Sequence, residues 1–71
     1  MTSPLQVYRV IKVRSDGMRL PHGGRMRSIY RARLTARLLA VKNRDPRVES
    51  FAVSDGKKLV FQTPAGGDIG Q

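Results

Sequence analysis

Residues 28–46 read SIYRARLTARLLAVKNRDP, and this stretch decides the fold because it is the only part of the chain with the length and spacing of a helix. Ser28 suits the N-cap position, since its side chain can accept a hydrogen bond from the first helical turn. Asp45 precedes Pro46, and the residue before a proline disfavours helical backbone. We therefore predict a helix from Ser28 to Asn43.

The apolar residues of this helix form two stripes on nearly opposite sides, at about 100° per residue. A single sheet can cover only one of them, and the sequence leaves open which one it covers. The other stripe needs the chain's own loops, a second copy of the chain or a partner. One stripe holds Tyr30, Leu34, Leu38 and Val41, and the other holds Ile29, Ala32, Ala36, Leu39 and Ala40.

The segment before the helix predicts at least one strand. Residues 5–13 are rich in β-branched and aromatic side chains, with apolar residues on both faces, which indicates a central or partly covered strand. After a turn at 15–17, a second strand would run through 18–20 or through 25–28. Pro21 and two glycines are expected to end the first of these segments. The orders β-α-β-β and β-β-α-β-β therefore both remain open.

Residues 48–63 predict a β-hairpin around Ser54-Asp55-Gly56. A two-residue Asp55-Gly56 turn would pair Phe51 with Val60 and place apolar side chains on both faces. A three-residue loop would pair Phe51 with Leu59. We favour the three-residue loop because it gives one clean apolar face. That face would hold Phe51, Val53, Leu59 and Phe61.

Together these elements predict one small α+β domain, with an antiparallel sheet of three to four strands and a single helix packed on one face. The domain is expected to span residues 5–63, after a disordered N-terminus at 1–4 and before a flexible glycine-rich tail at 64–71. No apolar run approaches the ~18 residues of a membrane span. The first residues also lack a signal-peptide pattern, so we predict a cytoplasmic protein without a membrane partner.

Charge is the strongest functional clue. The chain has 14 Lys and Arg against 5 Asp and Glu, a net charge of +9 and a pI near 11.5. Between Asp16 and Asp45 there is no acidic residue, although eight Lys and Arg lie there. A helix with uncompensated cations repels itself. We therefore expect an external polyanion or acidic surface to supply the missing negative charge, although an Arg-rich proteome could also produce a merely solvated basic face.

The leading hypothesis is a nucleic-acid-binding protein that contacts the phosphates of DNA or RNA without strong sequence preference. Cations near a helix N-terminus are disfavoured by the helix dipole, so those gathered there call for another explanation. Together with free backbone N–H groups, they would form a phosphate-binding corner. The candidate anion-binding residues are Arg25, Arg27, Arg31, Arg33 and Arg37.

The alternative is a protein-interaction module, a regulator or inhibitor that docks on a host protein. Its contact would be an acidic or apolar surface, or a second copy of itself, and a homodimer is compatible with either hypothesis. In size, Arg bias and lack of enzyme motifs the chain resembles small proteins of actinobacterial phages or their hosts, a resemblance that implies an accessory protein of a phage or mobile element. The candidate interface is the stripe of Tyr30, Leu34, Leu38 and Val41.

No enzyme motif is present, and we predict no catalytic residues, metal, cofactor or small-molecule substrate. The chain has no cysteine and one histidine, His22, so thiolate chemistry and a histidine metal cluster are excluded. Asp16, Asp45 and Asp55 occupy turn or helix-stop positions, which favour Asp for backbone reasons. Paired carboxylates and phosphate-loop spacing are also missing.

Overall fold

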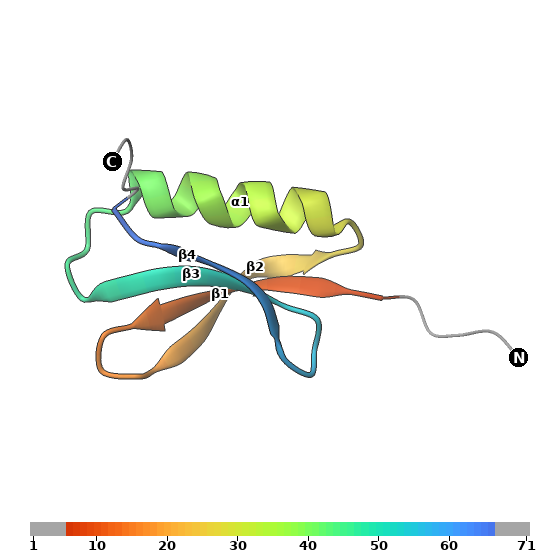
Figure 1. Cartoon of the computed structure of the whole chain (residues 1–71), viewed down its shortest axis with the longest axis horizontal. Coiled ribbons are helices and arrows are strands. Elements are labelled where there is room, and N and C mark those ends of the chain that lie inside the picture. Colours follow the sequence, from red (N-terminus) through yellow and green to blue (C-terminus); the bar gives the residue numbers. More distant parts are fainter. Residues whose placement is uncertain (1–5, 67–71) are drawn as a thin grey trace, which may run out of the picture.

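The computed structural model describes residues 6–66 and consists of a four-stranded antiparallel sheet with one helix across one face (Figure 1). This confirms the predicted α+β class, and of the two open orders the structure has β-β-α-β-β. The order across the sheet is β2-β1-β3-β4, so β1 is central, as its two apolar faces suggested. The elements are β1 (Tyr8–Arg14), β2 (Arg19–Met26), α1 (Ile29–Lys42), β3 (Val48–Ser54) and β4 (Leu59–Pro64).

Strand β2 continues through the proline and the glycine pair, so the expectation that they end it is wrong. Val10 pairs with His22 while Arg9 pairs with Arg25, and the register shifts between them. The extra residues of β2 are accommodated there, and Gly23 adopts a φ of +78°. Because β2 is an edge strand, Pro21 can lack an N–H without breaking an interior ladder.

The predicted helix and its boundaries are confirmed. The Ser28 side chain accepts a hydrogen bond from the Arg31 backbone N–H at 3.3 Å, as an N-cap does. At the other end Asn43 has extended backbone, and its amide donates to the Asp45 carbonyl at 2.9 Å. The helix has no acidic residue in its first turn. Its electrostatics are therefore as unbalanced as the sequence indicated.

Helix α1 packs on the sheet through its small residues. Ala32 and Ala36 are completely buried and Ala40 is 1% exposed, so the backbone of the helix lies close to the sheet. The opposing surface is already filled by bulky side chains, which leaves little volume for larger helix residues. The rest of the core consists of Val10, Val48, Phe51 and Val53, with Tyr8, Met26, Leu39, Phe61 and Ala65 packed around it.

The register favoured for the β3–β4 hairpin is wrong, and so is the two-residue alternative. Phe51 pairs with Thr63, whereas the two predicted registers paired it with Leu59 or Val60. Leu59 pairs with Ser54. The connection is longer because the Asp55 N–H donates to the Lys58 carbonyl at 3.1 Å. A register shift beside Val53 keeps Phe61 opposite it, so Phe51, Val53 and Phe61 share the core, as predicted. The prediction is wrong for Leu59, which pairs with Ser54 and is not part of the core cluster.

The chain beyond β4 is tied to the domain as far as the structure describes it. The Ala65 N–H donates to the Glu49 carbonyl at 2.9 Å, and the Gly66 N–H donates to the Ala40 carbonyl at 2.9 Å. The remaining tail, residues 67–71, and the predicted disordered residues 1–4 lie outside the described residues. Within residues 6–66, no helix has the length and apolar character needed to cross a bilayer.

Candidate functional site

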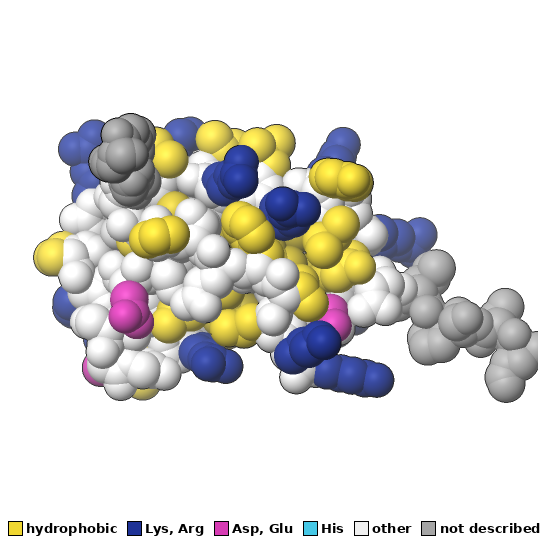
Figure 2. Space-filling view, viewed as in Figure 1, with side chains coloured by type: hydrophobic (Ala, Val, Ile, Leu, Met, Phe, Trp, Pro, Cys, Tyr) yellow, Lys and Arg dark blue, Asp and Glu magenta, His cyan; other side chains and the backbone are white. Residues whose placement is uncertain are grey.

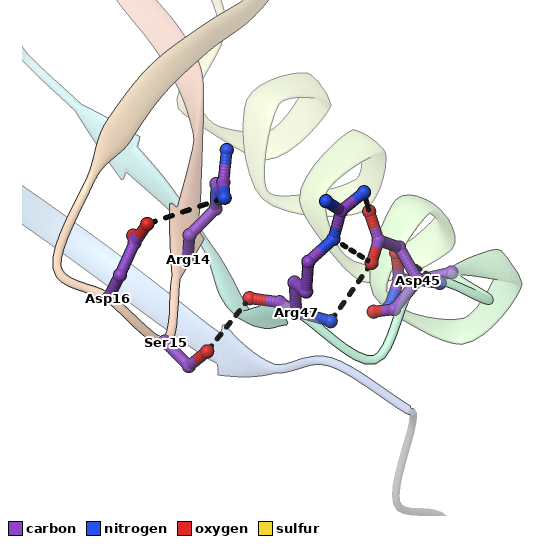
Figure 3. A network of polar contacts seen from close by, with 6 residues as sticks. Arg14, Ser15, Asp16, Asp45 and Arg47 are labelled. Atoms are coloured by element: carbon purple, nitrogen blue, oxygen red, sulfur yellow. Dashed lines mark hydrogen bonds and ion pairs between the residues drawn. The ribbon is translucent and has the colours of Figure 1, made fainter.

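The ion pairs of residues 6–66 are both local. Arg14 pairs with Asp16 at 3.3 Å, and Arg47 pairs with Asp45 at 3.2 Å. Figure 3 shows these two pairs side by side, where the β1–β2 turn meets the connection from α1 to β3. Ser15 joins them, since its backbone N–H and hydroxyl both donate to the Arg47 carbonyl, at 2.8 and 3.2 Å. The carboxylates of Asp16 and Asp45 therefore stabilise the two loops in which they lie.

Asp45 and Asp55 are likewise occupied by local backbone groups. The Arg47 backbone N–H, followed by its guanidinium, lowers the pKa of Asp45 below its ordinary value. The backbone N–H groups of Lys58 and Lys57 lower the pKa of Asp55 in the same way. Both side chains therefore stay charged at neutral pH, but they are committed to loop hydrogen bonds and not to the cations of the helix.

The cations of the central window have no acidic partner among the described residues. None of the Lys and Arg side chains from Arg19 to Arg44 forms an ion pair with a carboxylate of residues 6–66. Figure 2, seen from the same direction as Figure 1, shows Lys and Arg side chains interleaved with hydrophobic ones over the helix, and no acidic side chain there. This part of the surface therefore presents positive charge that the described fold does not neutralise.

Two of these cations converge on one aromatic ring. The guanidinium carbon of Arg33 lies 5.1 Å from the centroid of the Phe61 ring, and that of Arg37 lies 5.8 Å from it. A cation over an aromatic face is attracted by the electron-rich ring. Phe61 comes from β4 and is itself half-buried against the core, so it holds both guanidinium groups on the same side of α1. We call Arg33 and Arg37 the basic flank.

The structure separates the other three candidate anion-binding residues from the basic flank. Arg31 lies across the helix from it and lines a depression with Met26 and Thr35. Arg27 is exposed in the connection between β2 and α1. Arg25 pairs with Arg9 across β1 and β2, on the side of the sheet away from the helix. Of the five predicted residues, only Arg33 and Arg37 are therefore brought together.

The candidate interface stripe lies on the outer face of α1, away from the sheet. Its four side chains are between 49% and 77% exposed, and Tyr30 is the most exposed of them. A depression of about 170 Å³ separates part of the stripe from the basic flank. We call these four residues the outer stripe: Tyr30, Leu34, Leu38 and Val41.

Residues 6–66 contain no cluster of three or more His, Asp or Glu side chains that could hold a metal ion. The exposed His22 lies in a T-shaped arrangement with the Phe51 ring, with 6.3 Å between the ring centroids. Comparisons with protein-family models, with curated proteins and with solved structures found no match for this chain.

Proposed function

We propose that this chain is a non-enzymatic nucleic-acid-binding protein that contacts phosphates through the basic flank of α1. The observation that carries the proposal is the placement of Arg33 and Arg37 over one ring without a described acidic partner. We propose further that the chain is an accessory protein of a phage or mobile element, as its size, Arg bias and lack of enzyme motifs suggested.

The physical argument starts from the cost of placing these two cations together. Arg33 and Arg37 are four residues apart, so they are neighbours on one helix face and destabilise the helix by a few tenths of a kcal/mol. The Phe61 ring offsets part of this repulsion and restrains two otherwise flexible side chains. A restrained guanidinium loses less entropy when it binds a phosphate oxygen, and its planar donors match phosphate geometry.

The composition of α1 favours binding without strong sequence preference. Between Ile29 and Lys42 the helix contains no Asn, Gln, Asp or Glu, the side chains that with Arg make most base-edge contacts. Phosphate contacts position a protein on a nucleic acid but carry no sequence information themselves. The overall charge of +9 adds long-range attraction to any polyanion.

The test is a salt titration of binding to duplex DNA, single-stranded DNA and RNA of matched length. The double variant Arg33→Gln/Arg37→Gln should lower the steepness of the log–log salt dependence by about 1.8 on duplex DNA, or by about 1.4 on single strands. The matched control is Arg31→Gln/Lys42→Gln, which removes the same charge from the other side of the same helix. This control should lower the steepness of the salt dependence by less than Arg33→Gln/Arg37→Gln does.

Two outcomes contradict the proposal. If the unmodified protein binds none of the three nucleic acids at ~50 mM salt, where phosphate contacts are strong, the function is wrong. If the two double variants lose affinity and salt dependence equally, the binding follows net charge, and the basic flank has no particular role.

A further inference from the structure

The outer stripe presents a feature that phosphate binding does not use. Tyr30, Leu34, Leu38 and Val41 are 77%, 58%, 49% and 59% exposed, whereas the alanines of the same helix are buried. Contiguous apolar surface of this kind marks an interaction site when polar groups border it. A phosphate backbone offers these four side chains no apolar partner. The stripe therefore calls for an occupant of its own.

Leu34 lies between two surface depressions that could accept side chains of a partner. On one side lies the depression of about 170 Å³ lined by Tyr30, Leu34, Arg33 and Arg37. On the other side lies a second depression, of about 380 Å³, lined by Met26, Leu34, Arg31 and Thr35. Leu34 is thus a ridge between two hollows. A neighbouring helix packs in this way, with its own ridges in the grooves beside the first helix.

Charge identifies the occupant further, because cations border the stripe on both sides and α1 contains no carboxylate. A second copy of this chain would set cations against cations along both flanks, whichever way the two helices ran. A partner with Asp or Glu on both sides of its own apolar stripe would instead meet a cation on each side. The bordering cations are Arg33 and Arg37 on one flank, and Arg31 and Lys42 on the other.

We infer that the outer stripe docks an acidic amphipathic helix of another protein. Its apolar side chains would recur every three or four residues and lie along the Leu34 ridge. Its carboxylates would pair with the bordering Arg and Lys side chains. The 14 residues of α1 span about 21 Å, which matches roughly four turns of such a partner.

The test uses synthetic peptides and the full chain. The probe is a fluorescent helical peptide of about four turns, with Leu along one face and Glu on both flanks. One control peptide has the same composition in a scrambled order that destroys the apolar face, and the other replaces Glu by Lys. Fluorescence anisotropy measures the affinity of each. The key variant is Leu34→Gln/Leu38→Gln, which leaves the net charge unchanged and keeps good helix formers.

We expect the Glu-flanked peptide to bind, the scrambled peptide to bind at least about tenfold more weakly, and the Lys-flanked peptide not to bind. Leu34→Gln/Leu38→Gln should weaken binding of the Glu-flanked peptide by about tenfold or more, as truncation of central apolar contacts does. Its affinity for nucleic acid should stay unchanged, which separates this inference from the proposed function.

Three results would overturn the inference. Equal binding of the ordered and scrambled peptides would show attraction to charge alone. An equal loss of oligonucleotide binding in Leu34→Gln/Leu38→Gln would place nucleic acid on the stripe. A dimer of the unmodified protein by sedimentation, converted to a monomer by this variant, would identify a second copy as the occupant.

Discussion

Replacing Ala36 by Leu should destabilise the domain more than removing two large leucines from the same helix. Ala36 is 0% exposed and belongs to the core cluster between α1 and the sheet, so its methyl group is enclosed by other atoms. Leu adds an isopropyl group within this enclosed contact. The helix must then move away from the sheet, or the added atoms must displace core side chains such as Val10 and Phe51.

The magnitude follows from this burial. Overpacking a filled core costs about 1–3 kcal/mol of unfolding free energy, and the absence of residual exposure at Ala36 favours a value near ~2 kcal/mol. In a domain of this size, about 2 kcal/mol lowers the melting temperature by roughly 8–16 °C. Leu34→Gln and Leu38→Gln act at side chains that are 58% and 49% exposed. Each should change the unfolding free energy by less than about 0.5 kcal/mol.

Thermal and urea unfolding, followed by circular dichroism, measure both effects. The reasoning is refuted if Leu34→Gln/Leu38→Gln loses several kcal/mol while Ala36→Leu unfolds like the unmodified protein. Such a result would mean that the leucine stripe faces the sheet, because replacing buried leucines costs at least about 2 kcal/mol each. The docking surface proposed on the outer stripe would then not exist. The stability comparison therefore tests the foundation of the functional inference without any ligand.

Two further predictions concern the turns. The melting temperature should fall as the pH drops from about 5 to 2. A carboxylate whose pKa is lower in the folded state stabilises the fold at pH values above its unfolded-state pKa. That contribution is lost as the pH falls through its folded-state pKa. The ordinary pKa of an Asp side chain, from which those of Asp45 and Asp55 are lowered, is 3.8. Asp55→Asn should make the melting temperature fall less steeply with pH, because Asn can accept the same hydrogen bonds but does not titrate. An unchanged pH profile in that variant would count against the assigned contacts. Gly56 has a φ of +99°, so Gly56→Ala should cost about 1 kcal/mol of unfolding free energy. Gly24→Ala, where φ is not positive and a Cβ would meet no atom within 4 Å, is the matched control and should stay within about 0.5 kcal/mol.

The parts of the fold that depend on residues close together in the sequence could be predicted. Ser28 and the Asp45-Pro46 pair act within one turn of the helix ends, so the helix boundaries follow from local backbone chemistry. The course of β2 could not be predicted in this way. A proline and two glycines weaken a strand in general, but they are tolerated at an edge. That β2 lies at the edge depends on β3 pairing with the other side of β1.

The hairpin shows the same limit at shorter range. An Asp-Gly pair indicates a turn, yet Asp55 satisfies the N–H groups of both Lys57 and Lys58, which lengthens the connection beyond either predicted form. The candidate site is unaffected by this difference, because the favoured register and the observed one both place Phe61 on the core face with Phe51 and Val53. The spacing of Arg33 and Arg37 is visible in the sequence, but the ring beneath them is not. That Phe61 lies below these two arginines depends on how α1 crosses the sheet, which no local sequence pattern specifies.

The choice between the two helix stripes carries the strongest argument for a partner. Burying large apolar side chains stabilises a fold more than burying alanine, at about 25 cal/mol per Å² of apolar surface. A domain of 71 residues has a marginal core and would gain from enclosing the larger stripe. Here the helix buries Ala32, Ala36 and Ala40 and exposes Leu34 and Leu38. The bulky side chains of the sheet explain why alanines fit inside, but they do not explain why the outside is apolar, since Gln or Glu would serve a solvated helix face equally well. An exposed apolar stripe between two rows of cations is what a helix needs if its outer face meets an apolar, acidic partner.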